Sequence, residues 1–156
     1  MVYPFSVQEK LRIKFREGVR QGFAKNIEMD PVVPDAMIPV VESEETLIVR
    51  VDSTKGPRYW FSDRRLLWQH DHGIDELLRY DSVTGAHWMF RDFWTDRVKL
   101  LGTEEAASQF KADHFDRLEI ESGDRLVILE GLDQAYWPVL HFFEWITRPS
   151  ARRTPR

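Results

Sequence analysis

The sequence contains no cysteine, and this single absence removes several kinds of chemistry. Without cysteine there is no disulfide, no thiolate zinc site, no iron–sulfur ligation and no cysteine nucleophile. The sequence also lacks a nucleophile elbow, a glycine-rich phosphate loop and a His-Glu-x-x-His helix. No motif therefore prescribes a reaction, and we expect a non-catalytic protein without a metal or a cofactor.

Long apolar runs are also scarce. The longest uncharged apolar run, Ala135 to Phe143, includes Pro138 and His141, and it is far shorter than the roughly 20 residues that span a bilayer. Charged residues follow Met1 to Phe5, so no signal peptide is indicated. These observations predict a soluble cytoplasmic protein, with peripheral attachment to a membrane left open.

The 156 residues are 42% hydrophobic, 13% aromatic and 31% charged, which predicts one globular domain with a modest appendage. The net charge of -4 disfavours a general nucleic-acid-binding protein. Charge is distributed unevenly, because basic side chains outnumber acidic ones between Ser6 and Asn26, and four arginines without any acid follow Ile146. The middle of the chain is correspondingly acidic.

The N-terminal segment has the pattern of an amphipathic helix. Ser6 and Glu9 form a capping-box signature, and apolar residues then recur at intervals of four, at Val7, Leu11, Phe15, Val19, Phe23 and Ile27. Because each step of four advances 400°, the apolar stripe winds by about 40° per step. We predict a helix over about residues 7–25, within a basic segment 1–28. Pro31, Pro34 and Pro39 predict an extended connector over residues 29–45, which makes the helix an appendage.

The rest of the chain has the pattern of short strands and one closing helix. A half-buried strand is predicted from Leu47 to Val51, and successive hairpins follow. The predicted strands lie at 59–61, 65–69, 77–80, 83–90, 98–101, 117–121 and 125–129, with a short helix beginning at Thr103. Residues 133–147 are predicted as the closing helix, with its regular part beginning nearer Tyr136 because of Pro138. A disordered basic tail is predicted over residues 148–156.

Two short stretches resemble a known family. Tyr59-Trp60-Phe61-Ser62-Asp63-Arg64-Arg65-Leu66-Leu67-Trp68 and Leu78-Arg79-Tyr80-Asp81-Ser82-Val83-Thr84-Gly85-Ala86 are similar to strands of bacterial pleckstrin-homology-like (GRAM-like) domains. The resemblance implies a mainly β (α+β) fold over residues 46–147. That fold is a strongly bent antiparallel sheet or barrel of about seven strands, with a C-terminal capping helix and, here, an extra N-terminal helix. Ring-shaped homo-oligomers are also known in the family.

Basic residues near the predicted turns are candidates for binding an anion. In phosphoinositide-binding relatives the turn after the first strand supplies cations to the headgroup, which points to Lys55 and Arg58, with Arg64 as a further cation. Several convergent cations favour phosphate binding. The family pattern is incomplete, because Trp60 stands where another arginine is usual. An ordinary solvated turn is the competing interpretation.

Apolar residues on the two helices are candidates for an interface. The closing helix carries Trp137 and Trp145 away from its main apolar stripe, and Phe15 and Val19 lie on the winding stripe of the first helix. A second apolar face favours contact with another subunit or a protein partner. We therefore expect a binding or assembly module that binds a second copy or another protein. Peripheral binding to anionic lipid through the basic helix is an alternative.

Titratable clusters give weaker indications. His70 and His72 lie two residues apart, but a metal site normally needs three or four ligands, and His87 is the nearest further histidine. These three histidines are the residues to inspect if the protein carries a small ligand or is an enzyme with a pocket inside the sheet. The acidic residues are interpreted as solvated, since no spacing selects a catalytic pair among Glu42, Glu44, Glu45, Asp92, Asp96 and Asp116.

Overall fold

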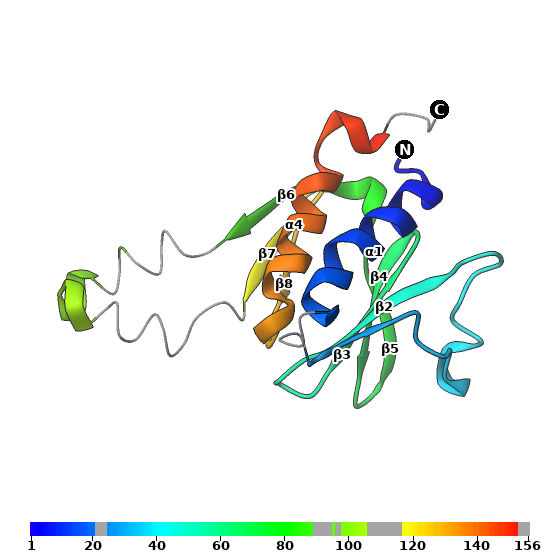
Figure 1. The fold of residues 1–156 in the computed structure, drawn as a ribbon, viewed down its shortest axis with the longest axis horizontal. Coiled ribbons are helices and arrows are strands. Elements are labelled where there is room, and N and C mark those ends of the chain that lie inside the picture. The colour runs from blue at the N-terminus through cyan, green and yellow to red at the C-terminus, as the bar shows by residue number, and fades with distance from the viewer. Residues whose placement is uncertain (21–24, 89–94, 96–97, 106–116, 153–156) are drawn as a thin grey trace.

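The computed structural model describes residues 1–20, 25–88, 95, 98–105 and 117–152. It is a mixed α+β fold in which two antiparallel sheets and two long helices surround a common core (Figure 1). The first sheet has the order β1-β2-β3-β4-β5, and the second has the order β6-β7-β8. Among the described strands the two sheets form no closed barrel. Of the two expected forms, a bent sheet or a barrel, the closed barrel is therefore wrong.

The first sheet is an antiparallel meander whose neighbours along the chain also pair in space. Its strands are β1 (Ile27–Met29), β2 (Leu47–Asp52), β3 (Arg58–Ser62), β4 (Arg65–His70) and β5 (Gly73–Arg79). The second sheet contains β6 (Val83–Trp88), β7 (Leu118–Ser122) and β8 (Arg125–Leu129). The predicted hairpins at 59–69 and 117–129 are confirmed. The predicted strand at 98–101 is wrong, because these residues are helical.

The first helix, α1, runs over Pro4–Arg20. Its first hydrogen bond joins the Val7 amide to the Tyr3 carbonyl, so Pro4 takes the first helical position, where a proline loses no bond. The expected capping role of Ser6 is therefore wrong, since Ser6 lies inside the helix. Residues 21–24 of the expected helix lie outside the described residues, and Ile27, the last member of the apolar stripe, begins β1 and pairs with Val51.

The winding apolar stripe explains how α1 packs. Val7, Leu11 and Phe15 are fully buried, whereas Val19, one turn further, is exposed. The helix is therefore part of the domain and not an appendage, because its buried face shares one core with both sheets and α4. Figure 1 shows α1 and α4 (Tyr136–Ile146) side by side, and Lys10 lies over the Trp145 ring at 5.3 Å.

The proline-rich connector is also integrated into the fold. Its short 3₁₀ turn η1 (Asp35–Met37) places Met37 on the outer face of the first sheet, where a second apolar cluster contains Met37, Leu47, Trp60 and Leu67. The expected half-buried pattern is confirmed from Val49 to Asp52, where Val49 and Val51 are buried and Arg50 and Asp52 are partly exposed. It is wrong at the start of β2, because Ile48 lies in the main core and Leu47 in the outer cluster, beside a register shift between Leu47 and Val49.

The C-terminal segment follows the prediction in its helix but not in its tail. The 3₁₀ turn η3 (Asp133–Ala135) leads into α4, which begins at Tyr136 as Pro138 suggests. Beyond α4, the turn η4 (Pro149–Arg152) buries Ala151, and the Arg152 guanidinium donates to the Val83 carbonyl at 3.2 Å. Residues 149–152 are therefore ordered, contrary to the expected disordered tail, and residues 153–156 lie outside the described chain.

Candidate functional site

The three candidate anion-binding cations do not converge. Lys55 and Arg58 flank the turn between β2 and β3, and Arg58 lies 3.4 Å from Asp52. Arg64 lies at the opposite end of β3, in the turn before β4, with its guanidinium 3.8 Å from Asp63. Because a phosphate site gains from several cations around one point, this arrangement does not create the expected headgroup site.

The four candidate interface residues have different environments. Phe15 is buried, with its ring centroid 5.4 Å from that of Phe61, so it belongs to the core and the interface prediction for it is wrong. Trp145 is partly buried beneath Lys10. Val19 and Trp137 are exposed near the adjoining ends of α1 and α4.

The histidines do not assemble a metal site. The His70 Nε2 lies 2.6 Å from an Asp75 carboxylate oxygen, and its ring stacks on Trp68 at 4.2 Å. His87 pairs with Glu121 on the second sheet. In the described part of the chain, no three His, Asp or Glu side chains are placed to hold a metal ion. Asp92, Asp96 and Asp116 lie outside the described residues.

A buried ionic cluster is the feature that the sequence reasoning missed. The Arg65 guanidinium donates to both carboxylate oxygens of Glu45, at 2.8 and 2.9 Å, and to the Val40 carbonyl. Burial by itself would raise the pKa of Glu45, but hydrogen bonds from Arg65, the Glu42 amide and Ser62 lower it to about 2. Glu45 is therefore buried and paired, whereas we expected a solvated side chain. The signal in the sequence was slight, because Glu45 and Arg65 are separated by twenty positions.

The geometry of this cluster indicates a structural role. Ser62, Arg65 and Glu45 satisfy one another, and the Ser62 hydroxyl also accepts the Arg65 amide in the turn between β3 and β4. The cluster thereby holds the end of the connector against that hairpin. Its charges are paired and buried, so they are poorly placed to act on a substrate.

A pocket of about 280 Å³ opens between the two sheets. Tyr59, Trp68 and Leu77 contribute from the first sheet and Ile128 from β8, while Lys55 and Glu130 carry the charges at its edge. None of the three histidines lines this pocket. They therefore no longer support the alternative of an enzyme with a pocket inside the sheet. The Tyr59 hydroxyl donates to the Glu130 carbonyl and accepts the Glu130 amide, so the pocket wall is fixed.

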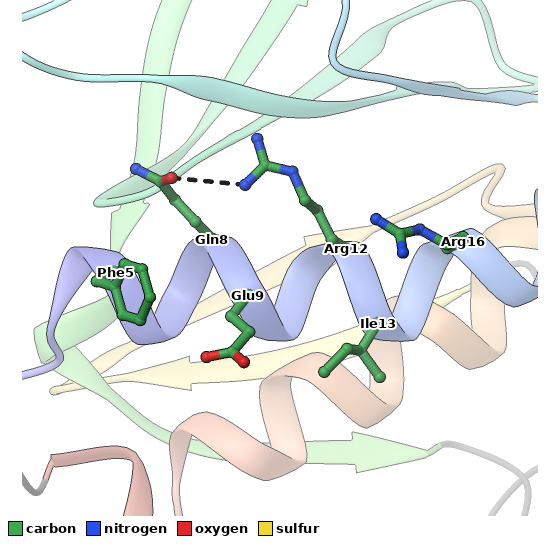
Figure 2. A pocket seen from close by; sticks show the side chains of 6 residues that line it. All are labelled: Phe5, Gln8, Glu9, Arg12, Ile13 and Arg16. Carbon is green, nitrogen blue, oxygen red and sulfur yellow. Dashed lines mark hydrogen bonds between the residues drawn. The ribbon is translucent and has the colours of Figure 1, made fainter. Parts of the chain in front are cut away.

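The outer face of α1 is the second candidate surface. A hollow of about 360 Å³ is lined there by Phe5, Gln8, Glu9, Arg12, Ile13 and Arg16. Phe5 and Ile13 are 66% and 57% exposed, and Figure 2 shows them on the same side of the helix with Glu9 between them. Gln8 bonds Arg12, which also lies 2.7 Å from Asp30. Arg16 has no ion pair within the described residues.

Two further findings concern membrane-spanning helices and similarity to known proteins. None of the described helices is long and apolar enough to cross a membrane. Comparison with protein-family models, curated proteins and solved structures finds no match to the chain.

Proposed function

We propose that this protein is a non-catalytic binding and assembly module of pleckstrin-homology-like architecture. The proposal for the fold is supported by the order of its elements. The antiparallel strands β2–β5 are followed by β6–β8 and then by the helix α4. This order agrees with what the resemblance of residues 59–68 and 78–86 implies.

The outer face of α1 carries the proposal for assembly. Phe5 and Ile13 remain exposed although the opposite face of the same helix is fully buried. When a partner covers a large apolar side chain on a rigid element, the burial stabilises the complex by about 25 cal/mol per Å² of apolar surface. Because α1 is already anchored in the fold, a partner that binds its outer face does not have to order the helix.

The charge of this face indicates the partner's chemistry. Arg16 adjoins Ile13 in the same hollow, and α1 as a whole is basic, since five cations stand against two acids: Lys10, Arg12, Lys14, Arg16 and Arg20 against Glu9 and Glu17. The chain outside its two basic segments is acidic. The face therefore suits an acidic protein surface, and a second copy of the chain supplies one.

The test is sedimentation of the full chain over a wide range of concentrations. We expect association that weakens as salt rises, because part of the attraction is electrostatic. Ile13→Ser should weaken association by about tenfold, as expected when a central apolar contact is removed. Val32→Ser is the matched control, since Val32 is an exposed apolar residue away from α1.

A chain that stays monomeric at every concentration would contradict self-association. Anionic lipid is the alternative ligand, because exposed apolar and cationic side chains on one helix also suit a lipid surface. Co-sedimentation with vesicles of phosphatidylserine and phosphatidylcholine separates the two. Binding to the anionic vesicles that is lost in Ile13→Ser, without self-association, would favour the lipid.

A further inference from the structure

The outer face of the β6-β7-β8 sheet carries apolar side chains that the core does not cover. Val127 and Leu129 of β8 are buried, whereas Leu126 and Ile128, which alternate with them, are 53% and 38% exposed. An antiparallel sheet usually presents polar side chains on its solvated face, but β8 presents two aliphatic ones. This sheet face therefore offers apolar surface that a partner can bury.

The same face is acidic. Glu121 lies opposite Leu126 and Glu119 lies opposite Ile128 in the register of β7 and β8, and directly opposite residues share one face of a sheet. We call these four residues the β7–β8 face. Within the described chain Glu119 has no ion pair, and Glu121 pairs with His87, which is a cation only when protonated. The β7–β8 face thus combines apolar and acidic side chains, whereas the outer face of α1 combines apolar and basic ones.

These two outer faces cannot meet within one chain. α4 packs against β6 and β7, and α1 packs against α4 and the first sheet. The buried sides of α1, β7 and β8 belong to one core cluster, so their outer faces point away from that shared core. Contact between the two faces therefore requires a second copy of the chain.

Charge decides which of the faces pair. Two α1 faces would bring together two basic helices, since α1 carries five cations and two acids, and two β7–β8 faces would bring acids against acids. Like charges across an interface are unfavourable, whereas a basic face on an acidic face is favourable. The shapes agree with the unlike pairing. Phe5 of α1 is 66% exposed, and Ile128 of the β7–β8 face borders the apolar pocket of about 280 Å³.

We propose that the outer face of α1 of one copy binds the β7–β8 face of a second copy, so that the copies associate head to tail. This inference rests on the self-association proposed above, and it adds the surface of the second copy that α1 contacts. A head-to-tail contact leaves one face of each kind free at the ends of a pair. Association therefore continues beyond two copies, whereas a symmetric contact between two α1 helices ends at a dimer.

The test mixes two full-length variants that each lack one face. Ile13→Ser weakens the α1 face. Leu126→Lys removes an exposed apolar side chain from the β7–β8 face and adds a charge of the same sign as that of α1. Sedimentation should show that each variant alone associates about tenfold more weakly than the natural chain. An equal mixture should form a dimer with the affinity of the natural contact, because the intact β7–β8 face of one variant meets the intact α1 face of the other.

Two further variants control for folding and for position. Glu121→Lys changes the same face through charge alone, on a side chain that is 48% exposed, and it should weaken association by a similar factor. Val32→Lys is the matched control, because Val32 is 86% exposed and lies on the connector. It should associate like the natural chain. Dimer formation in the mixture itself requires that both of its variants are folded.

The outcomes separate the two proposals. A natural chain that stays monomeric contradicts self-association and the head-to-tail contact together. If Ile13→Ser weakens association but Leu126→Lys and Glu121→Lys leave it unchanged, α1 contacts another surface, and only the head-to-tail contact is overturned. A mixture that associates no better than its two components would overturn that contact in the same way.

Discussion

Gly131 lies where the end of β8 meets the turn between β2 and β3. The Ser53 hydroxyl donates to the Glu130 carbonyl, and the Thr54 amide donates to the Gly131 carbonyl. Gly131 has a φ of +70°, and a Cβ there would lie 2.2 Å from Ser53 Oγ and 2.9 Å from the Lys55 amide nitrogen. We predict that Gly131→Ala lowers the free energy of unfolding by about 2–4 kcal/mol, from backbone strain and steric overlap together.

Urea unfolding measures this loss, and Gly123→Ala provides the comparison. Gly123 also has a positive φ, but a Cβ there has nothing within 4 Å. The strain contribution should remain, so the expected loss is only about 1–2 kcal/mol. Equal losses at the two positions would show that the contact with Ser53 and Lys55 adds nothing.

Glu45 gives the protein a specific sensitivity to acid. Because the folded pKa of Glu45 is lowered from 4.5 to about 2, its contribution to stability is complete above pH 4.5 and is lost as the pH falls toward 2. Glu45→Gln should abolish this part of the acid dependence. At pH 7 the same change should cost about 3 kcal/mol, because it leaves the buried Arg65 without its carboxylate.

Chemical unfolding at neutral and acidic pH measures both effects of Glu45→Gln. Glu42→Gln is the matched control, because Glu42 bonds the more exposed Arg79 and its carboxylate is partly solvated. The control should lose little stability at neutral pH. If Glu45→Gln kept the full acid dependence of the natural chain, another group would have to be responsible.

At the scale of the element, the direction in which the apolar stripe of α1 winds determines the effect of a substitution. Leu11 is fully buried and Val19 is exposed. We predict that Leu11→Ala lowers the free energy of unfolding by about 3 kcal/mol, whereas Val19→Ala changes it by no more than about 0.5 kcal/mol. Thermal unfolding followed by circular dichroism distinguishes them. A comparable loss at both positions would mean that the last turn of α1 is packed.

Elements that depend on local pattern could be predicted from the sequence. The hairpin of β7 and β8 follows from two apolar runs around Gly123, and the beginning of α4 follows from Pro138. The connector could not be predicted in the same way, because Met37 and Glu45 are fixed by Trp60 and Arg65, which are remote in sequence. The helical residues 98–101 were mistaken for a strand because a short apolar run has no distinguishing period.

At the scale of the whole molecule, the candidate sites were less predictable than the fold. Lys55 does lie at a pocket, but Arg64 lies at the far end of the hairpin and Phe15 lies in the core. A sequence shows which residues are charged or apolar, whereas convergence is decided by how the sheets pack. The pocket between the sheets leaves no local pattern, since it is formed by segments that meet only in the folded chain.

The neighbouring positions of α1 and α4 have a consequence for the folding of the newly made chain. The core that covers Phe15 includes Phe61 and, through it, Phe142 and Phe143 near the other end of the sequence. Contacts over such long separations close late and slow folding. During synthesis, α1 emerges before α4, and its apolar face stays uncovered until α4 packs on it. This interval is the time at which the chain is most exposed to aggregation and most dependent on chaperones.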